Sequence, residues 1–224
     1  MAEKKVWFIT GCSTGLGRDL AEVLLEQGYR VVATARRLDS ITDLAERFPE
    51  NARIASLDVT DRDEISAAVE KAIEEFGRID VLVNNAGYGL LGAIEEPSTE
   101  QIRAQFDTNV FGAVDVMRAV LPQMRRQKSG HVLNMSSVAG FIASGSAGYY
   151  AATKFALEAL SEALAQEAAD HGIRVTIVEP GPFRTDFAGR SLQGPEGQMP
   201  DVYPGTQRFL DYFAEVDRKQ IGDP

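Results

Sequence analysis

Three residues near the middle of the chain have the types and the spacing of a proton-transfer device. Tyr150 and Lys154 lie four residues apart at the start of an alanine-rich helical stretch, and Ser137 lies thirteen residues before Tyr150. Residues i and i+4 share a helix face, so the ammonium of Lys154 can lie close to the phenol and favour its ionised form. Bringing a phenol pKa from about 10 towards neutrality needs roughly 3 units, or about 4 kcal/mol. One unit charge at about 4 Å supplies that much at an effective dielectric constant of roughly 20. We therefore predict that Tyr150 is a general acid/base.

A second, independent signature opens the chain. Residues 6–10 form a short apolar, β-prone run, followed by Gly11-Cys12-Ser13-Thr14-Gly15-Leu16-Gly17 and by an amphipathic helix pattern that continues to Gln27. This order predicts a strand, a glycine turn and a helix N-terminus. Glycines let the backbone approach a pyrophosphate closely, and the unpaired N–H groups of a helix start favour that anion. The alternative is an ordinary tight turn, because Gly-x-x-x-Gly-x-Gly is not the standard dinucleotide fingerprint.

Five motifs in one order resemble those of the short-chain dehydrogenase/reductase family. In chain order they are residues 10–17, Asn84-Asn85-Ala86-Gly87, Asn109, Ser137 with Tyr150 and Lys154, and Pro180-Gly181. The resemblance extends from residue 6 to about residue 187. The stretch from residue 87 to 121 is similar to the branch that contains hydroxysteroid and retinol dehydrogenase-like enzymes. The fold implied is a single-domain, Rossmann-like α/β domain over residues 1–224.

The resemblance implies roles for four catalytic residues. Tyr150 exchanges a proton with the substrate oxygen, Ser137 holds that oxygen, and Lys154 also hydrogen-bonds the nicotinamide ribose. Asn109 is expected to interrupt a helix and to hold a water that leads protons to Lys154. From chemistry alone Ser136 is an alternative to Ser137, although the thirteen-residue interval favours Ser137. Without the resemblance, Asn109 would be read as an amide on a helix surface.

The resemblance and the charge pattern together predict the cofactor site. The second strand ends at Ala35-Arg36-Arg37, where an enzyme that uses NAD would carry an acidic residue. Arginines offer charge and bidentate donors to a 2′-phosphate, so we expect NADP(H), with NAD(H) as the alternative. The arginines could instead only solvate the following loop. The resemblance implies that Asp58 contacts the adenine, and its position also allows it to cap the helix that begins near residue 61; the two roles are compatible. The expected cofactor-binding residues are Gly11, Ser13, Thr14, Gly15, Leu16, Gly17, Arg36, Arg37, Asp58, Val59, Asn85, Ala86, Gly87, Lys154, Pro180, Gly181 and Thr185.

Composition agrees with one soluble α/β domain. The chain has 224 residues, of which 44% are hydrophobic and 25% are charged. A formal net charge of −10 argues against nucleic acid or an anionic membrane as a partner. Cys12 is the only cysteine, so neither an internal disulfide nor a metal-thiolate cluster is expected, and no metal is predicted. The apolar run after the first lysines is too short for a signal peptide or a membrane span, which favours a cytoplasmic location.

Alternation of strand and helix patterns predicts a doubly wound parallel sheet with helices on both faces. The pattern also places glycines at the C-termini of three helices, namely Gly28, Gly77 and Gly172, and a capping box at Ser98 and Gln101. The expected strands are residues 6–10, 31–34, 54–57, 81–83, 132–135 and 175–178. The expected helices are residues 16–27, 39–48, 61–76, 99–127 and 149–171.

The carboxyl-terminal stretch departs from the family pattern. Residues 188–224 are expected to form a substrate-side loop and a helical tail, with a helix near residues 206–219. Asp223-Pro224 is a typical helix start, so the final helix and strand of the family are expected to be absent. The sheet would then have six strands and an exposed edge, and a full-length form is expected to be a homo-oligomer.

These features together predict an oxidoreductase that transfers a hydride between NADP(H) and a carbonyl or secondary alcohol. Residues flanking the predicted site are apolar, which favours a small to mid-sized hydrophobic substrate: Tyr88, Leu90, Leu91, Phe141, Ile142, Phe183 and Phe187. One alternative is a cofactor-binding sensor or scaffold protein that never turns over. Another is epimerisation or dehydration of a nucleotide-linked sugar, for which the chain is too short.

Overall fold

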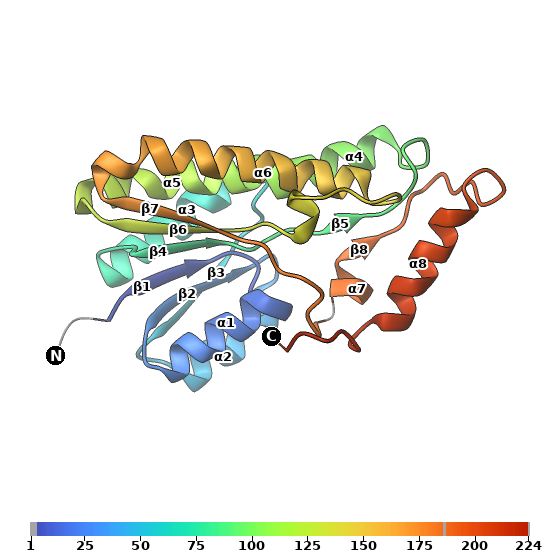
Figure 1. The fold of residues 1–224 in the computed structure, drawn as a ribbon. Helices are drawn as coiled ribbons and strands as arrows, with labels where there is room; N and C mark the ends of the chain where they lie inside the picture. Colours follow the sequence, from blue (N-terminus) through green and yellow to red (C-terminus); the bar gives the residue numbers. More distant parts are fainter. Residues whose placement is uncertain (1–3, 186, 224) are drawn as a thin grey trace.

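A parallel sheet of six strands forms the centre of the computed structural model, which describes residues 4–185 and 187–223 (Figure 1). The strand order is β3-β2-β1-β4-β6-β7, and each neighbouring pair is parallel. The strands are β1 (Val6–Ile9), β2 (Arg30–Ala35), β3 (Ala52–Ser56), β4 (Val81–Asn84), β6 (Gly130–Met135) and β7 (Ile173–Val178). All six lie where the sequence predicts them, with shifts of one to two residues at most of their ends.

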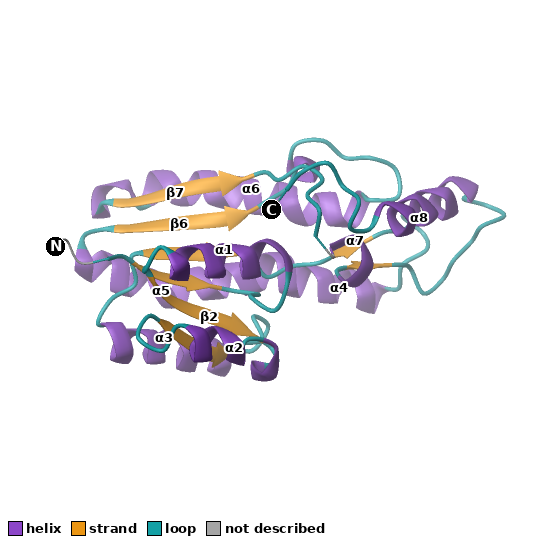
Figure 2. Ribbon diagram, turned by 90° about the horizontal axis from the view of Figure 1, so that it is seen from below, coloured by secondary structure: helices purple, strands orange, loops and turns teal. Residues whose placement is uncertain are grey.

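Helices cover both faces of this sheet, as a doubly wound fold requires. One face is covered by α3 (Arg62–Phe76), α5 (Ala113–Gln127) and α6 (Gly148–Glu167). The other face is covered by α1 (Gly15–Glu26) and α2 (Thr42–Arg47) (Figure 2). In Figure 2, β6 and β7 have no helix in front of them on the α1 and α2 side. The predicted fold class is confirmed.

The two helical layers enclose two apolar cores, one on each face of the sheet. Successive side chains of a strand point to opposite faces, so the neighbours Phe8 and Ile9 enter different cores. Phe8 packs with Val32 and Leu82 on the α3, α5 and α6 side. Ile9 packs with residues such as Val31 on the α1 and α2 side. This two-sided burial explains why residues 31–33 of β2 and 81–83 of β4 are continuous apolar runs.

Local signals at the helix ends behave largely as the sequence predicts. The helix α4 (Thr99–Phe106) begins with the full capping box of Ser98 and Gln101. Gly77 ends α3 in the left-handed conformation, with a φ of 73°. The capping role considered for Asp58 is wrong, because Asp61 caps α3 and its side chain accepts from the N–H groups of Asp63 and Glu64. Asp58 instead accepts from the N–H and the hydroxyl of Thr60, at 2.9 and 2.7 Å.

The helix expected over residues 99–127 is interrupted. A π-helical segment, Asp107–Gly112, separates α4 from α5 and contains the buried Asn109. The resemblance implied such an interruption at Asn109. Short 3-10 helices lie at Leu38–Ser40, Val138–Gly140 and Ala169–His171.

Elements beyond the sheet close the end of the molecule where the parallel strands finish. A two-stranded parallel ladder joins β5 (Gly89–Leu90) to β8 (Leu192–Gln193), and α7 (Phe187–Arg190) and α8 (Pro204–Val216) lie beside it. The helix near residues 206–219 is confirmed as α8. β5 and β8 were not predicted, because a two-residue strand has no alternating pattern in the sequence. Pro224, the second residue of the expected helix start, lies outside the described residues. No helix in the described ranges is long and apolar enough to cross a membrane.

Candidate active site

A cavity of about 1500 Å³ lies at the carboxyl ends of the parallel strands and gathers most of the predicted site residues. Ligands of open α/β sheets bind at this edge. The predicted catalytic residues Ser137, Tyr150 and Lys154 line it. The predicted cofactor-binding residues that also line it are Gly11, Ser13, Thr14, Gly15, Leu16, Arg36, Asp58, Val59, Asn85, Ala86, Gly87, Pro180, Gly181 and Thr185. Gly17, Arg37 and Asn109 are not among the lining residues.

The glycine turn after β1 is held in place by the turn after β4. The Asn85 Nδ2 donates to the carbonyl oxygens of Thr10 and Gly11, at 2.9 and 3.0 Å. In return, the hydroxyl of Thr10 accepts from the N–H groups of Asn85 and Ala86, both at 3.0 Å. A Cβ on Gly17 would lie 2.6 Å from the Gly11 carbonyl oxygen and closer still to the Asn85 amide. Gly17 therefore acts through packing, because its missing side chain lets α1 approach this turn.

The start of α1 has the properties of an anion site. Thr14 occupies the N-cap position in an extended conformation, but its side chain does not cap the helix, and the first turn carries no acidic residue. The first N–H groups of a helix have no intrahelical acceptor, and the helix dipole adds positive potential there. Ser13, Thr14, Gly15 and Leu16 all line the cavity. The residues present therefore fit the pyrophosphate of a dinucleotide.

The two arginines after β2 differ in position. Arg36 lines the cavity together with Ala35. The Arg37 side chain is 73% exposed, and its guanidinium Nε lies 3.8 Å from an Asp39 carboxylate oxygen. The structure thus brings only Arg36 to the cavity, while Arg37 matches the alternative of a solvated loop residue.

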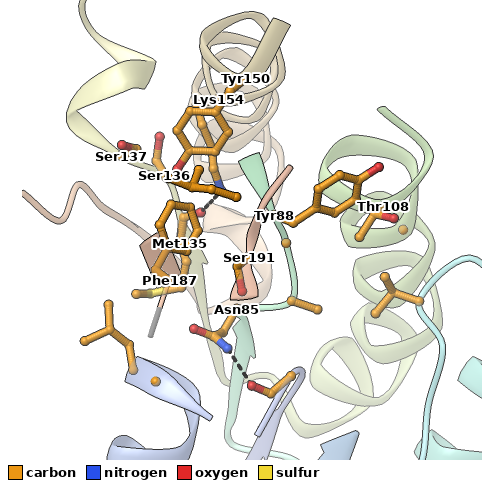
Figure 3. Close-up of a pocket in the computed structure, with 18 of the residues that line it drawn as sticks. Asn85, Tyr88, Thr108, Met135, Ser136, Ser137, Tyr150, Lys154, Phe187 and Ser191 are labelled. Carbon is orange, nitrogen blue, oxygen red and sulfur yellow. Dashed lines mark hydrogen bonds between the residues drawn. The ribbon is translucent and has the colours of Figure 1, made fainter. Parts of the chain in front are cut away.

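The candidate proton-transfer residues meet on one side of the cavity (Figure 3). Tyr150 and Lys154 project from the first turns of α6, and the Lys154 ammonium lies 5.7 Å from the centre of the Tyr150 ring. The same ammonium donates to the Met135 carbonyl oxygen at 2.7 Å. Ser137 follows β6, and its hydroxyl accepts from the Ala139 N–H at 3.1 Å. The shared helix face predicted from the spacing is present.

The pKa values differ from the sequence prediction in direction. Burial raises the pKa of the Tyr150 phenol, and only a hydrogen bond with Ser137 opposes that effect. Burial also lowers the pKa of Lys154 to about 8. The predicted lowering of the Tyr150 pKa is therefore not found, because burial removes the solvent that would stabilise a charged phenolate. A protonated phenol is a proton donor.

Asn109 is buried behind the site and clamps the backbone of Tyr88. Its Oδ1 accepts from the Tyr88 N–H at 3.0 Å, and its Nδ2 donates to the Tyr88 carbonyl oxygen at 2.7 Å. The same Nδ2 lies 3.1 Å from the hydroxyl of Thr153, which donates to the Tyr150 carbonyl oxygen at 2.7 Å. Gln105 adds a hydrogen bond to the Tyr88 carbonyl oxygen at 3.2 Å. The Asn109 side chain thus ties the turn after β4 to the first turn of α6.

The two serines after β6 differ in their burial and in their partners. Both line the cavity, but Ser136 is only 4% exposed, and its hydroxyl has no hydrogen-bond partner among the described residues. Ser137 is the one whose side chain lies near enough to the Tyr150 phenol to oppose the rise in its pKa. This contact favours Ser137 as the partner of Tyr150 in acting on a substrate oxygen.

The part of the cavity near Tyr150 is largely apolar. Of the seven flanking residues that the sequence analysis named, Tyr88, Leu91, Phe183 and Phe187 line the cavity. Leu90 is buried in the fold, whereas Phe141 and Ile142 are 80% and 65% exposed. The Phe187 ring centre lies 6.1 Å from that of Tyr150. The lining residues that the sequence analysis missed on this side include Val138, Leu192, Phe209 and Phe213.

A buried polar chain also escaped the sequence analysis. The Nδ2 of Asn84 donates to Asn134 Oδ1 at 2.9 Å, and the Nδ2 of Asn134 donates to the Ser161 hydroxyl at 2.7 Å. These bonds join β4, β6 and α6 beneath the site. Asn134 lies at an expected strand position, and nothing in its local sequence marks it as a partner of Asn84. In the described residues, no group of three or more His, Cys, Asp or Glu side chains could hold a metal ion.

Comparison with known proteins agrees with this geometry. A family model described as short chain dehydrogenase matches residues 5–195. An oxidoreductase named BOA17, from Botryotinia fuckeliana, is 43% identical over 97% of this chain and 78% of its own length. Retinol dehydrogenase 8 from Homo sapiens is 40% identical over 97% of this chain and 72% of its own length.

Solved structures agree as well. A short-chain dehydrogenase from Streptomyces avermitilis has a TM-score of 0.87 and 40% identity, over 96% of this chain and 83% of its own. ElxO, solved with NADP bound, has a TM-score of 0.77 and 34% identity, over 82% of this chain and 75% of its own. The chain therefore belongs to the short-chain dehydrogenase family of oxidoreductases. The family resemblance inferred from the five motifs is confirmed.

Proposed function

We propose that this chain catalyses hydride transfer between NADP(H) and a carbonyl or secondary alcohol substrate. One observation carries the proposal: Ser137, Tyr150 and Lys154 line the same cavity as the glycine turn and the uncapped start of α1. A proton-transfer group beside an anion-binding helix start is what this redox reaction needs. Membership of an oxidoreductase family supports the same conclusion.

The cavity residues divide between the parts of the proposed cofactor. The N–H groups at the start of α1 would hold the pyrophosphate, and Arg36 would hold the 2′-phosphate of NADP(H). Asp58 and Val59 would lie at the adenine, and Thr185 at the nicotinamide. The bound cofactor supplies or accepts the hydride. A structural relative with NADP bound supports this assignment, and NAD(H) is the alternative that the Arg36 test in the Discussion separates.

In the reductive direction, Tyr150 gives its phenolic proton to the carbonyl oxygen while Ser137 donates a hydrogen bond to that oxygen. The raised pKa of Tyr150 keeps the proton on the phenol at neutral pH, which suits a proton donor. The Lys154 ammonium then stabilises the phenolate by its charge, and the phenol regains a proton through Lys154 and the water proposed beside Asn109. In oxidation, the phenolate accepts the proton of the alcohol.

The apolar wall near Tyr150 supports a hydrophobic substrate. Leu91, Phe187 and Leu192 line this part of the cavity, together with Phe209 and Phe213 of α8. A relative of 40% identity is named for retinol, which is an apolar alcohol. We therefore place the substrate among hydrophobic ketones, aldehydes and the corresponding alcohols.

The proposal is tested by following NADPH absorbance with a panel of ketones and aldehydes. Tyr150→Phe should keep NADPH binding and lose nearly all turnover, because the phenyl ring fills the same space but has no proton to give. Tyr149→Phe is the matched control, since the Tyr149 hydroxyl donates to the Ile94 carbonyl oxygen at 2.9 Å outside the site. If Tyr150→Phe keeps more than about a tenth of the rate, Tyr150 is not the acid. NADPH binding without turnover of any carbonyl would favour the sensor or scaffold alternative.

A further inference from the structure

The segment between β8 and α8 connects two stretches that line the cavity and has no regular structure of its own. Residues 194–203, here called the cover segment, contain no helix or strand. Cavity-lining residues flank the segment on both sides, with Leu192 and Gln193 before it and Phe209 and Phe213 after it. In Figure 1 this loop runs from β8 to the far end of α8, beside the loop that follows β5. Its position must therefore be set by contacts with neighbouring elements.

Glu96, in the loop between β5 and α4, supplies one set of these contacts. The residue is only 3% exposed. One carboxylate oxygen accepts from the Met199 N–H at 2.9 Å, and the other accepts from the Ala93 N–H at 2.7 Å. The Glu96 carbonyl oxygen accepts from the Gly197 N–H at 3.1 Å. A buried carboxylate is costly unless donors pair with it, so both N–H groups are needed for Glu96 to stay buried.

Gln101, in the first turn of α4, supplies a second set. Its Nε2 donates to the Gly194 carbonyl oxygen at 3.0 Å. Its Oε1 accepts from the Glu196 N–H at 2.9 Å and from the Ser98 N–H at 3.2 Å. The bond to Ser98 belongs to the capping box of α4. One side chain therefore fixes the start of α4 and the cover segment at the same time.

Close packing supports these hydrogen bonds. A Cβ on Gly197 would lie 2.9 Å from the Glu96 carbonyl oxygen, so the two backbones approach as closely as a glycine allows. Pro195 packs against the other end of the loop, where a Cβ on Gly92 would lie 3.1 Å from Pro195 and Pro97. Contacts of this kind leave the cover segment little freedom while the hydrogen bonds are intact.

We propose that Glu96 and Gln101 are positioning residues that anchor the cover segment and thereby hold the substrate-side wall of the cavity. Four backbone groups of the cover segment, at residues 194, 196, 197 and 199, are paired with these two residues. The anchor itself follows from these contacts, and its consequence for substrate affinity rests on the proposed function. The expected cofactor contacts of the glycine turn and Arg36 come from β1, α1 and β2, which take no part in the anchor.

Two variants test the anchor by different means. Gln101→Glu keeps a side-chain oxygen that can accept from the Ser98 N–H, and Glu is a favoured residue at this position of a capping box. The variant loses the Nε2 group that donates to the Gly194 carbonyl oxygen. Glu96→Ala removes the carboxylate from the Met199 N–H. Glu100→Gln is the control, because it neutralises an exposed carboxylate in the same turn of α4.

Hydrogen exchange of the peptide that covers residues 194–203 is the first measurement. Loss of a hydrogen bond to a charged or buried partner should speed exchange there about tenfold in Gln101→Glu and Glu96→Ala. The peptide that contains β1 and α1 should exchange as in the wild type, and the NADPH dissociation constant should not change. For a carbonyl substrate, KM should rise about tenfold while kcat changes less than about twofold.

The proposed anchor is refuted if hydrogen exchange of residues 194–203 is unchanged in both variants, or if Glu100→Gln speeds that exchange equally. Faster exchange with an unchanged KM in an active enzyme overturns the link to substrate affinity. If the wild type reduces no carbonyl while exchange still rises in both variants, the proposed function fails and the anchor stands.

Discussion

Replacing Lys154 by methionine should stabilise the protein at neutral pH while removing its activity. Burial lowers the pKa of Lys154 from 10.5 to about 8. A depression of this size means that the folded state disfavours the ammonium by about 3 kcal/mol, at about 1.4 kcal/mol per pKa unit. Methionine fills a similar volume with no charge to bury. It also loses the hydrogen bond to the Met135 carbonyl oxygen, worth about 1 kcal/mol. We expect Lys154→Met to raise the free energy of unfolding by about 2 kcal/mol at pH 7.

The difference in the free energy of unfolding between the two proteins should depend on pH. The unfolded chain keeps the lysine proton up to a pKa near 10.5, whereas the folded protein releases it above a pKa of about 8. Between these values the unfolded state binds more protons, so wild-type stability rises with pH in this window. The cost of the buried ammonium is fully present below pH 8. The advantage of Lys154→Met should therefore shrink by about 1.4 kcal/mol per pH unit above pH 8, reach zero at roughly pH 9.5, and be reversed by pH 10.5.

Urea unfolding of both proteins at several pH values from 7 to 10 provides the assay, and their difference cancels the titration of other groups. Lys71→Met is the control, because the exposed Lys71 also donates to a main-chain carbonyl oxygen, that of Ile54, at 2.9 Å. The control should show no such stabilisation. A Lys154→Met protein that is less stable than the wild type at pH 7, or a difference that is constant with pH, would refute the reasoning.

Three further predictions concern the cofactor side and the clamp behind it. Gly17→Ala should weaken NADPH binding at least about tenfold in a fluorescence titration, because the added Cβ displaces the glycine turn after β1. Gly145→Ala is the control and should bind NADPH normally, because no atom lies within 4 Å of the added Cβ. Arg36→Ala should lower the ratio of NADPH to NADH affinity about tenfold, and Arg37→Ala should not; equal effects would contradict the geometry. Asn109→Ala should lower the free energy of unfolding by about 2 kcal/mol in urea, because the Tyr88 N–H loses its acceptor and the Tyr88 carbonyl oxygen keeps only the donor from Gln105. A loss below about 0.5 kcal/mol would argue against the clamp.

The strand pattern and the placement of Tyr150 and Lys154 on one helix face were predictable from sequence because both depend on local order along the chain. Apolar runs such as residues 81–83 are typical of strands that are buried on both faces. In a parallel sheet, the turns that follow such strands lie at the same edge of the sheet. A spacing of four residues places Tyr150 and Lys154 on one helix face in any α-helix. The capping box of Ser98 and Gln101 is local for the same reason.

Other properties of the site depend on contacts between distant segments. Burial sets the direction of the Tyr150 pKa, and no spacing within α6 reveals how much solvent the fold removes. Arg36 and Arg37 are adjacent and chemically identical, but only Arg36 lines the cavity. Local sequence could not separate them, because the path of the loop after β2 decides which side chain faces inward.

The sequence by itself determined the class of fold, the family and the residues proposed for catalysis, since each depends on a short pattern with a fixed spacing. Only the tertiary structure decided that Asn109 clamps Tyr88, across 21 residues, and that Glu96 holds Met199, across 103 residues. Hydrogen bonds between such distant residues form only after the sheet and its helices have packed. Their partners are therefore a property of the assembled fold rather than of any segment.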